Sequence, residues 1–263
     1  GTPLFVVSEK RIKDNYRRVS GAFRKSYPGK VVVAYAVKAN FTLAIIRVLM
    51  LEGAWAETFS GPELHMALMA GVKPEKIVLT GGSRVEADFK EALEAGVGII
   101  VIDSVSELYR LNRAARELGV KAKVLIRVNP AVKVPTHPTI ATGVAGSKFG
   151  LDISSGDALK GFEEALKMDW VEPLGAHMHI GSRILVEEPF LEAAKRLMEF
   201  VVDLEARLGF RPSILDLGGG FGIPYKPEDR ANPLNIESLA GKISRILVEG
   251  FREAGLPLPT LIL

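Results

Sequence analysis

The chain has 263 residues, 48% of them hydrophobic and 25% charged, which is the composition of one large globular domain with a substantial core. Lys and Arg total 34 against 31 Asp and Glu, a net charge of +3, and there is neither a basic cluster nor an apolar stretch of the ~20 residues that span a bilayer. We therefore expect no nucleic-acid or membrane partner. The absence of cysteine excludes disulfides, thiolate metal sites and a cysteine nucleophile, and favours a cytoplasmic enzyme.

The first part of the chain, residues 1–29, is predicted to be an N-terminal strand and helix that lead into the main domain. Leu4–Val7 has the pattern of a strand outside that domain. The main domain is predicted to span residues 30–263.

Residues 30–263 repeat one pattern: a short, β-branched apolar run, a polar turn, an amphipathic segment and then a glycine. Such a pattern is typical of successive strand–helix units. Eight strands are predicted: Val31–Val37, Ala54–Phe59, Ile77–Thr80, Ile99–Ile102, Ala122–Val128, Leu174–Ile180, Ile214–Leu217 and Thr260–Leu263.

The helix boundaries carry their own signals. Three turns have a Ser followed three residues later by Glu, a pair that satisfies exposed amides at a helix start: Ser60 to Glu63, Ser83 to Glu86 and Ser104 to Glu107. Six glycines are predicted to end helices in the left-handed conformation: Gly53, Gly71, Gly96, Gly119, Gly209 and Gly255.

Strands separated by single helices form parallel sheets, and eight of them predict an α/β fold of the closed (β/α)8 TIM-barrel type. The active site of such a barrel lies at the carboxyl ends of its strands. The Pro- and Gly-rich interruption from Asn129 to Ile153 is predicted to be a long functional loop before the sixth helix.

Lys38 follows the first predicted strand, on the face that it shares with Ala34 and Ala36. An amine at the end of a barrel strand can form a Schiff base with an aldehyde. An isolated lysine at a strand end more often extends into water, so this interpretation depends on the other strand ends.

Two histidines, His177 and His179, share one face of the sixth predicted strand and should both point into the barrel. Histidines at this spacing can bind zinc, but the only others are His65 and His137, and no metal site is expected. A purely structural, hydrogen-bonded pair is the other alternative.

The glycine run Gly218, Gly219 and Gly220 follows the seventh strand, where barrel enzymes commonly bind phosphate. Its alternative is a tight turn before the loop Phe221–Pro227. Ser182, after the histidine-bearing strand, would add a hydroxyl to the same pocket. A lysine, a phosphate-binding turn and a flat imidazole together indicate a site for pyridoxal 5'-phosphate.

Six segments resemble those of one known family, and the resemblance covers nearly the whole chain. They are Ala36–Asn40, Arg127–Pro130, Thr136–Pro138 through Ala141–Gly143, Ser147–Gly150, His177–Ser182 and Leu215–Gly222. The family is the diaminopimelate decarboxylases, which belong to the alanine-racemase-like class (fold type III) of pyridoxal phosphate enzymes.

The resemblance implies a role for each matching residue. Lys38 matches the Schiff-base lysine and His179 the imidazole stacked on the cofactor ring. Ser182, Gly218, Gly219 and Gly220 match the phosphate-binding residues, and Arg127 and Glu57 match positions near the ring. Two residues differ from the family pattern: Glu57 stands where Asp is usual, and Arg183 stands where Gln is usual.

The resemblance also implies a longer enzyme. After the eighth strand, the family continues with a Glu-Pro-Gly-Arg motif and a C-terminal β-domain that completes the active site across a homodimer. We therefore expect this chain to be the barrel portion, with Leu4–Val7 as a strand of the missing β-domain, and to be inactive alone.

The function implied is that of a lyase in lysine biosynthesis, which decarboxylates the amino-acid substrate meso-diaminopimelate to L-lysine. Decarboxylation of ornithine, arginine or carboxynorspermidine is the nearest alternative. A non-catalytic pyridoxal phosphate-binding barrel and a metal-dependent amidohydrolase are the others.

Overall fold

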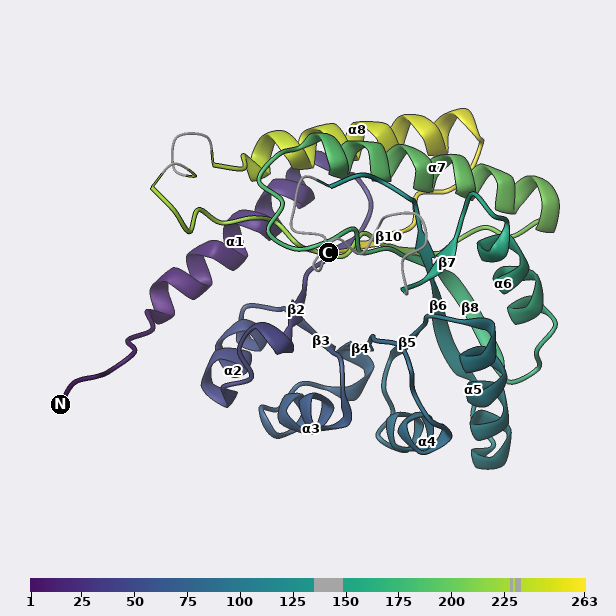
Figure 1. Ribbon diagram of the computed structural model, residues 1–263, viewed down its shortest axis with the longest axis horizontal. Helices are drawn as coiled ribbons and strands as arrows, with labels where there is room; N and C mark the ends of the chain where they lie inside the picture. The colour runs from purple at the N-terminus through teal and green to yellow at the C-terminus, as the bar shows by residue number, and fades with distance from the viewer. Residues whose placement is uncertain (135–148, 228, 230–232) are drawn as a thin grey trace.

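The computed structural model describes residues 1–134, 149–227, 229 and 233–263 (Figure 1). Strands and helices alternate along the chain, and every strand pairing is parallel. The strands are β1 (Val31–Val32), β2 (Ala34–Ala36), β3 (Trp55–Thr58), β4 (Ile77–Leu79), β5 (Ile99–Ile102), β6 (Ala122–Asn129), β7 (Leu151–Asp152), β8 (Val171–His177), β9 (Ile214–Asp216) and β10 (Thr260–Ile262).

The α-helices described are α1 (Glu9–Ser26), α2 (Leu43–Leu51), α3 (Gly61–Met69), α4 (Glu86–Glu94), α5 (Val105–Leu118), α6 (Asp157–Leu166), α7 (Glu188–Leu208) and α8 (Ile236–Glu253). Each presents buried apolar residues to the sheet and polar residues to solvent, as the amphipathic pattern predicts.

The sheet closes on itself at Val33. Its strand order runs β1-β10-β9-β8-β6-β5-β4-β3-β2, and Val33 alone separates the two ends of that path. The Val33 carbonyl accepts from Trp55 N at 3.0 Å, and the next amide, Ala34 N, donates to the Leu263 carbonyl at 2.9 Å. One interrupted strand therefore pairs with both neighbours, and the predicted parallel α/β barrel is confirmed.

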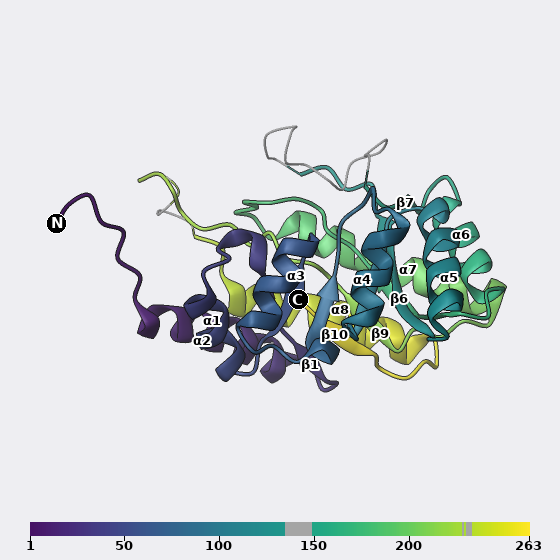
Figure 2. The ribbon, with the colours of Figure 1, turned by 90° about the horizontal axis from the view of Figure 1, so that it is seen from below.

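Helix α1 packs beside α8 on one side and α2 on the other (Figures 1 and 2). It precedes the first strand, yet it occupies the place that a helix after β10 would take in the ring. Phe23 and Tyr27 anchor it in the core, and the Tyr27 hydroxyl donates to the Pro259 carbonyl at 2.7 Å. The domain boundary at residue 29 stays a prediction.

The strand predicted at Leu4–Val7 is not formed in the described structure, and its place in a β-domain outside the barrel stays a prediction. These residues have no regular secondary structure and are exposed, with Phe5 at 98%. The segment runs away from the barrel in both views, so no described strand pairs with its backbone. Apolar, β-branched composition alone cannot hold an extended segment without such a partner.

Two predicted strands shift in the structure. The first ends at Ala36, and Val37–Ala39 forms a 3-10 turn that carries Lys38. The sixth begins at Val171 rather than Leu174 and ends at His177. The sequence did not indicate the earlier start, because a proline, Pro173, argues against a strand. The pairing with β6 shifts register at this point, between Val124 and Leu125, and a sheet tolerates proline at such an irregularity.

The predicted helix ends are confirmed, and two of the three predicted starts are. Ser60 and Ser104 accept from the amides of Glu63 and Glu107. Ser83 does not cap α4: the helix starts after Val85, whose amide donates to Asp88 at 2.8 Å. The six predicted end glycines all have positive φ: Gly53, Gly71, Gly96, Gly119, Gly209 and Gly255.

At the two ends of the predicted loop from Asn129 to Ile153, β6 extends through Asn129 and Leu151–Asp152 pairs with it. Its central motifs, Thr136–Pro138, Ala141–Gly143 and Ser147–Lys148, lie outside the described residues. The description also omits 228 and 230–232.

Replacing Phe162 with alanine should destabilise the fold by about 3–5 kcal/mol, because its buried ring packs against Phe200 at 5.8 Å and Phe210 at 5.2 Å between ring centroids. The matched control is Phe5→Ala, which removes an exposed ring and should change stability by less than about 0.5 kcal/mol. Urea unfolding measures both variants, and equal losses would contradict this packing.

Candidate active site

A cavity of about 290 Å³ lies at the carboxyl ends of the barrel strands. Five residues predicted from the sequence line it: Lys38, Glu57, Arg127, His179 and Ser182. Five further lining residues were not among the predicted site residues: Phe59, Glu63, Thr80, Phe149 and His177. Most of these residues lie within two positions of the carboxyl end of a strand, so parallel closure of the barrel brings them together.

Lys38 reaches the cavity from the 3-10 turn after β2. It is exposed, and its Nζ lies 5.3 Å from the centroid of the Phe59 ring. An ammonium over an aromatic face is held by electrostatic attraction without losing contact with water. The amine therefore stands at the cavity wall, where a ligand can reach it.

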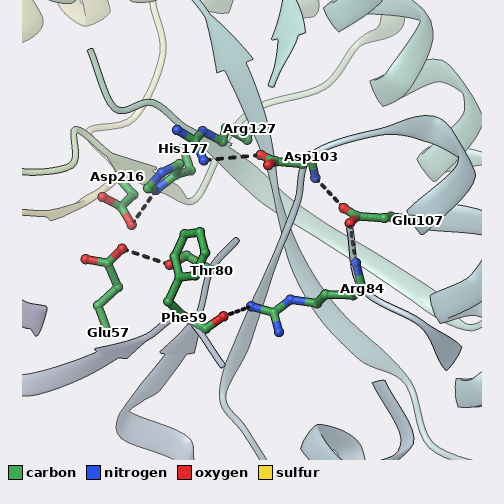
Figure 3. Close-up of polar contacts among 9 residues, drawn as sticks. All are labelled: Glu57, Phe59, Thr80, Arg84, Asp103, Glu107, Arg127, His177 and Asp216. Atoms are coloured by element: carbon green, nitrogen blue, oxygen red, sulfur yellow. Dashed lines mark hydrogen bonds and ion pairs between the residues drawn. The ribbon is translucent and has the colours of Figure 1, made fainter. Parts of the chain in front are cut away.

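His177 and Asp216 form a buried pair between β8 and β9 (Figure 3). His177 Nδ1 lies 3.0 Å from Asp216 Oδ2, and the other oxygen, Oδ1, accepts from Gly218 N at 2.8 Å. Burial opposes ionisation of Asp216, but the imidazole and the Gly218 amide outweigh it and lower the carboxyl pKa. Asp216 is thus a carboxylate that orients His177 and the glycine turn together.

His179 lies just beyond β8 and lines the cavity beside His177. Burial and, after it, the charge of Lys38 lower the pKa of His179 from 6.5 to about 3. The imidazole is therefore neutral at physiological pH, and it presents an uncharged flat ring to the cavity.

The three glycines of the predicted phosphate turn lie behind His179 rather than in the cavity wall. Gly218 has φ 66°, and a Cβ there would be 2.5 Å from the Met178 carbonyl oxygen and 3.0 Å from His179 Nδ1. A Cβ on Gly220 would overlap the Gly181 carbonyl oxygen. Gly219 has open space beside it and borders a neighbouring apolar cavity. The close backbone approach around His179 therefore requires glycine at 218 and 220.

Glu57 ends in the cavity from β3, where it pairs in register with Ala36 and Val78. Thr80 Oγ1, on the next strand end, donates to Glu57 Oε1 at 2.9 Å. Thr80 is the last residue of its predicted strand, and that position was the sequence signal for a lining residue.

Arg127, on β6, connects the cavity to a buried acidic cluster (Figure 3). Its Nη1 lies 3.4 Å from Asp103 Oδ1, and its guanidinium packs over the Phe149 ring at 4.7 Å. Behind this pair, Glu107 accepts from the amides of Asp103 and Arg84.

Arg183, which differs from the family pattern, lies on the rim with φ 59°. It pairs with Asp229 at 3.1 Å and packs over the Tyr225 ring at 5.1 Å. These contacts tie the Ser182 segment to the loop after the glycine turn.

Among the described residues, no three His, Cys, Asp and Glu side chains are grouped so that they could hold a metal ion. Within the same part of the chain, no helix has the length and apolar character required to cross a membrane.

Residues 11–263 match the family model of the pyridoxal-dependent decarboxylases, pyridoxal binding domain. The barrel and its lysine-bearing cavity are thus those of a pyridoxal-dependent decarboxylase. Within that class, the chain belongs to the diaminopimelate decarboxylase family, of which it is the pyridoxal-binding barrel domain.

The similar proteins agree on this placement. Diaminopimelate decarboxylase of Methanocaldococcus jannaschii is 44% identical over 228 residues, which cover 86% of this chain and 52% of the relative. The enzyme of Methanothermobacter thermautotrophicus is 40% identical over 263 residues, which cover 100% of this chain and 59% of the relative. The chain therefore spans little more than half the length of these relatives.

Solved structures show the same overlap. A crystal structure of diaminopimelate decarboxylase from M. jannaschii matches with a TM-score of 0.91 at 40% identity, covering 100% of this chain and 60% of the other. The Helicobacter pylori enzyme complexed with L-lysine matches with a TM-score of 0.89 at 32% identity, covering 100% of this chain and 63% of that one.

The residues present fit the cofactor that the family binds. An amine, an uncharged flat ring and a hydroxyl surround one cavity whose volume lies near the lower end of the usual range for small ligands, and the glycine turn lies next to the ring of His179. The roles of Lys38, Glu57, Arg127, His179, Ser182 and the three glycines stay predictions.

Replacing His179 with phenylalanine should make the stability of the chain less dependent on acid. The folded state keeps His179 neutral down to about pH 3, whereas the unfolded histidine takes up a proton near 6.5. Stability from this group is present above the unfolded pKa and falls with pH below it, by up to about 1.4 kcal/mol per pH unit. Urea unfolding at pH 7, 6 and 5 measures the slope. The same slope in parent and variant would contradict a neutral, half-buried imidazole.

Proposed function

We propose that this chain is the cofactor-binding barrel of an enzyme that decarboxylates meso-diaminopimelate to L-lysine with pyridoxal 5'-phosphate. The main support is the convergence of Lys38, Glu57, Arg127 and His179 on one cavity. The chain's identity of 40–44% to diaminopimelate decarboxylases favours this substrate over other basic amino acids. The relative from H. pylori was crystallised with L-lysine, the product of the proposed reaction.

When bound, the cofactor supplies an aldehyde that combines with an amine and a ring that withdraws electrons from the reacting carbon. We assign Lys38 to hold the aldehyde, because its amine stands at the cavity wall. Its exposure leaves room for a substrate amine to take the same place.

We assign His179 to pack against the cofactor ring. A neutral imidazole gives a flat face without adding positive charge, and its lowered pKa keeps it neutral throughout the physiological range. Asp216 holds the residues around it, because one carboxylate oxygen lies 3.0 Å from His177 Nδ1 and the other accepts from Gly218 N.

We assign the phosphate to Ser182 and the turn Gly218–Gly220. Gly218 contributes by shaping the turn, since its amide donates to Asp216. Ser182 supplies a hydroxyl, and backbone amides of glycines can approach an anion closely. Glu57 and Arg127 bring opposite charges to the remaining walls near the ring.

We propose that the whole enzyme acts as a cytoplasmic homodimer in which a C-terminal β-domain completes the site. Ornithine, arginine and carboxynorspermidine stay as alternative substrates, and a non-catalytic cofactor-binding barrel stays the alternative function.

Lys38→Ala should abolish covalent attachment of pyridoxal phosphate to this chain. After cofactor addition and borohydride reduction, mass spectrometry of the parent should find the label on the peptide that contains Lys38. Lys30→Ala, which removes another exposed lysine, is the matched control and should label like the parent. Equal labelling of several lysines, or retention of the label in Lys38→Ala, would refute the assignment.

The natural full-length polypeptide should release lysine and CO2 from meso-diaminopimelate at least about 100 times faster than it decarboxylates ornithine or arginine. Such a ratio is typical where a site pairs buried polar groups with its own substrate and leaves them unpaired with another. Lysine formation and CO2 release measure the rates. A preference for ornithine or arginine would refute the substrate, and cofactor binding without any turnover would support the non-catalytic alternative.

A further inference from the structure

Asp103 is a buried carboxylate that the proposed function does not use. Its side chain is 7% exposed, and neither of its oxygens has a hydrogen-bond partner. The nearest charge is Arg127 Nη1, 3.4 Å from Oδ1, on a guanidinium whose side chain is 6% exposed. Arg127 lines the cavity, whereas Asp103 lies behind it (Figure 3).

Contacts with Glu107 and with the segment that carries Gly82 and Arg84 fix the position of Asp103. Its amide donates to Glu107 Oε2 at 2.9 Å, and Glu107 Oε1 accepts from Arg84 N at 3.0 Å. Glu107 belongs to the first turn of α5 and is 1% exposed. On the other side, a Cβ at Gly82 would lie 2.5 Å from Asp103 Oδ2, so only glycine leaves space for the carboxylate. The chain holds this carboxylate in place without offering it a hydrogen-bond donor.

A buried carboxylate without hydrogen bonds costs several kcal/mol unless a charge compensates it. The same holds for the nearly buried guanidinium of Arg127. The two side chains therefore attract each other, and the carboxylate limits where the guanidinium can lie.

We propose that Asp103 is a positioning residue: through Arg127, it sets the orientation and the net charge of the cavity wall that receives the cofactor. The inference rests on the proposed function, because pyridoxal phosphate is the group that Arg127 would meet. Asp103 itself does not touch the cavity. Its effect on cofactor binding must therefore disappear when Arg127 is absent.

The test is a double-mutant cycle with Asp103→Asn, Arg127→Gln and the double variant, in which pyridoxal phosphate affinity and the circular dichroism of the bound cofactor are measured. Thermal unfolding without cofactor monitors the fold. We expect Asp103→Asn to weaken the affinity for pyridoxal phosphate by about 10-fold, which is the low end of the effect that residues behind metal ligands have on metal affinity. The variant should also alter the circular dichroism of the bound cofactor. In the Arg127→Gln background, it should cause no further loss.

The matched control is Asp203→Asn on α7, which removes an ion pair with Arg207 on the outside of the barrel and should leave affinity unchanged. If Asp103→Asn does not fold, Gly82→Ala takes its place, because the added methyl displaces the carboxylate and leaves every charge present. It should weaken affinity in the same way.

Two results would overturn the proposal: unchanged affinity in the folded Asp103 or Gly82 variant, or the same loss with and without Arg127. Either result leaves the proposed function standing as long as the parent binds the cofactor. Failure of the parent to bind pyridoxal phosphate would overturn both.

Discussion

Closure of the barrel at Val33 is the constraint on which the rest of the molecule depends. Because the carbonyl of Val33 bonds toward β3 and the next amide bonds toward β10, one strand of six residues completes two ladders. All the strands then run in one direction around a common axis, and their carboxyl ends meet. The site is a consequence of this geometry, since residues from six separate segments share one small cavity.

Because the polar strand ends converge, several charged side chains are buried close together, and the fold offsets the cost of burying them by pairing them. Asp216 is matched with His177, and Asp103 with Arg127. Glu107, in the first turn of α5, accepts from the backbone amides of Asp103 and Arg84. Removing one member of such a set leaves its partner buried and uncompensated. The residues that face the cavity are thus held by residues that a ligand never touches.

Most of the barrel could be predicted from sequence, because each unit carries local signals: β-branched runs, Ser caps and end glycines. The predictions differed from the structure where a local sequence signal lacked the partner or the backbone conformation that it needs. Leu4–Val7 is β-prone but has no described partner strand, and Ser83 has the spacing of a cap but adopts φ 64°.

The cavity shows the same division. Lys38 and His179 were recognisable as polar residues at strand ends, whereas Phe59 and Glu63 became neighbours of Lys38 only through the path of the following turn. The pairing of Asp103 with Arg127 joins the end of β5 to the neighbouring strand β6, and no spacing in the sequence encodes it.

The hydrogen bond from Gly218 to Asp216 has a consequence for how the site can be observed. A glycine amide in a turn ordinarily exchanges its hydrogen with water quickly, but this one is buried and bonded to a carboxylate. Exchange therefore requires the turn to separate from the carboxylate, so its rate reports the free energy of that local opening. Hydrogen exchange at the single Gly218 amide, followed by NMR, thus measures how readily the site opens locally, and it requires no bound ligand.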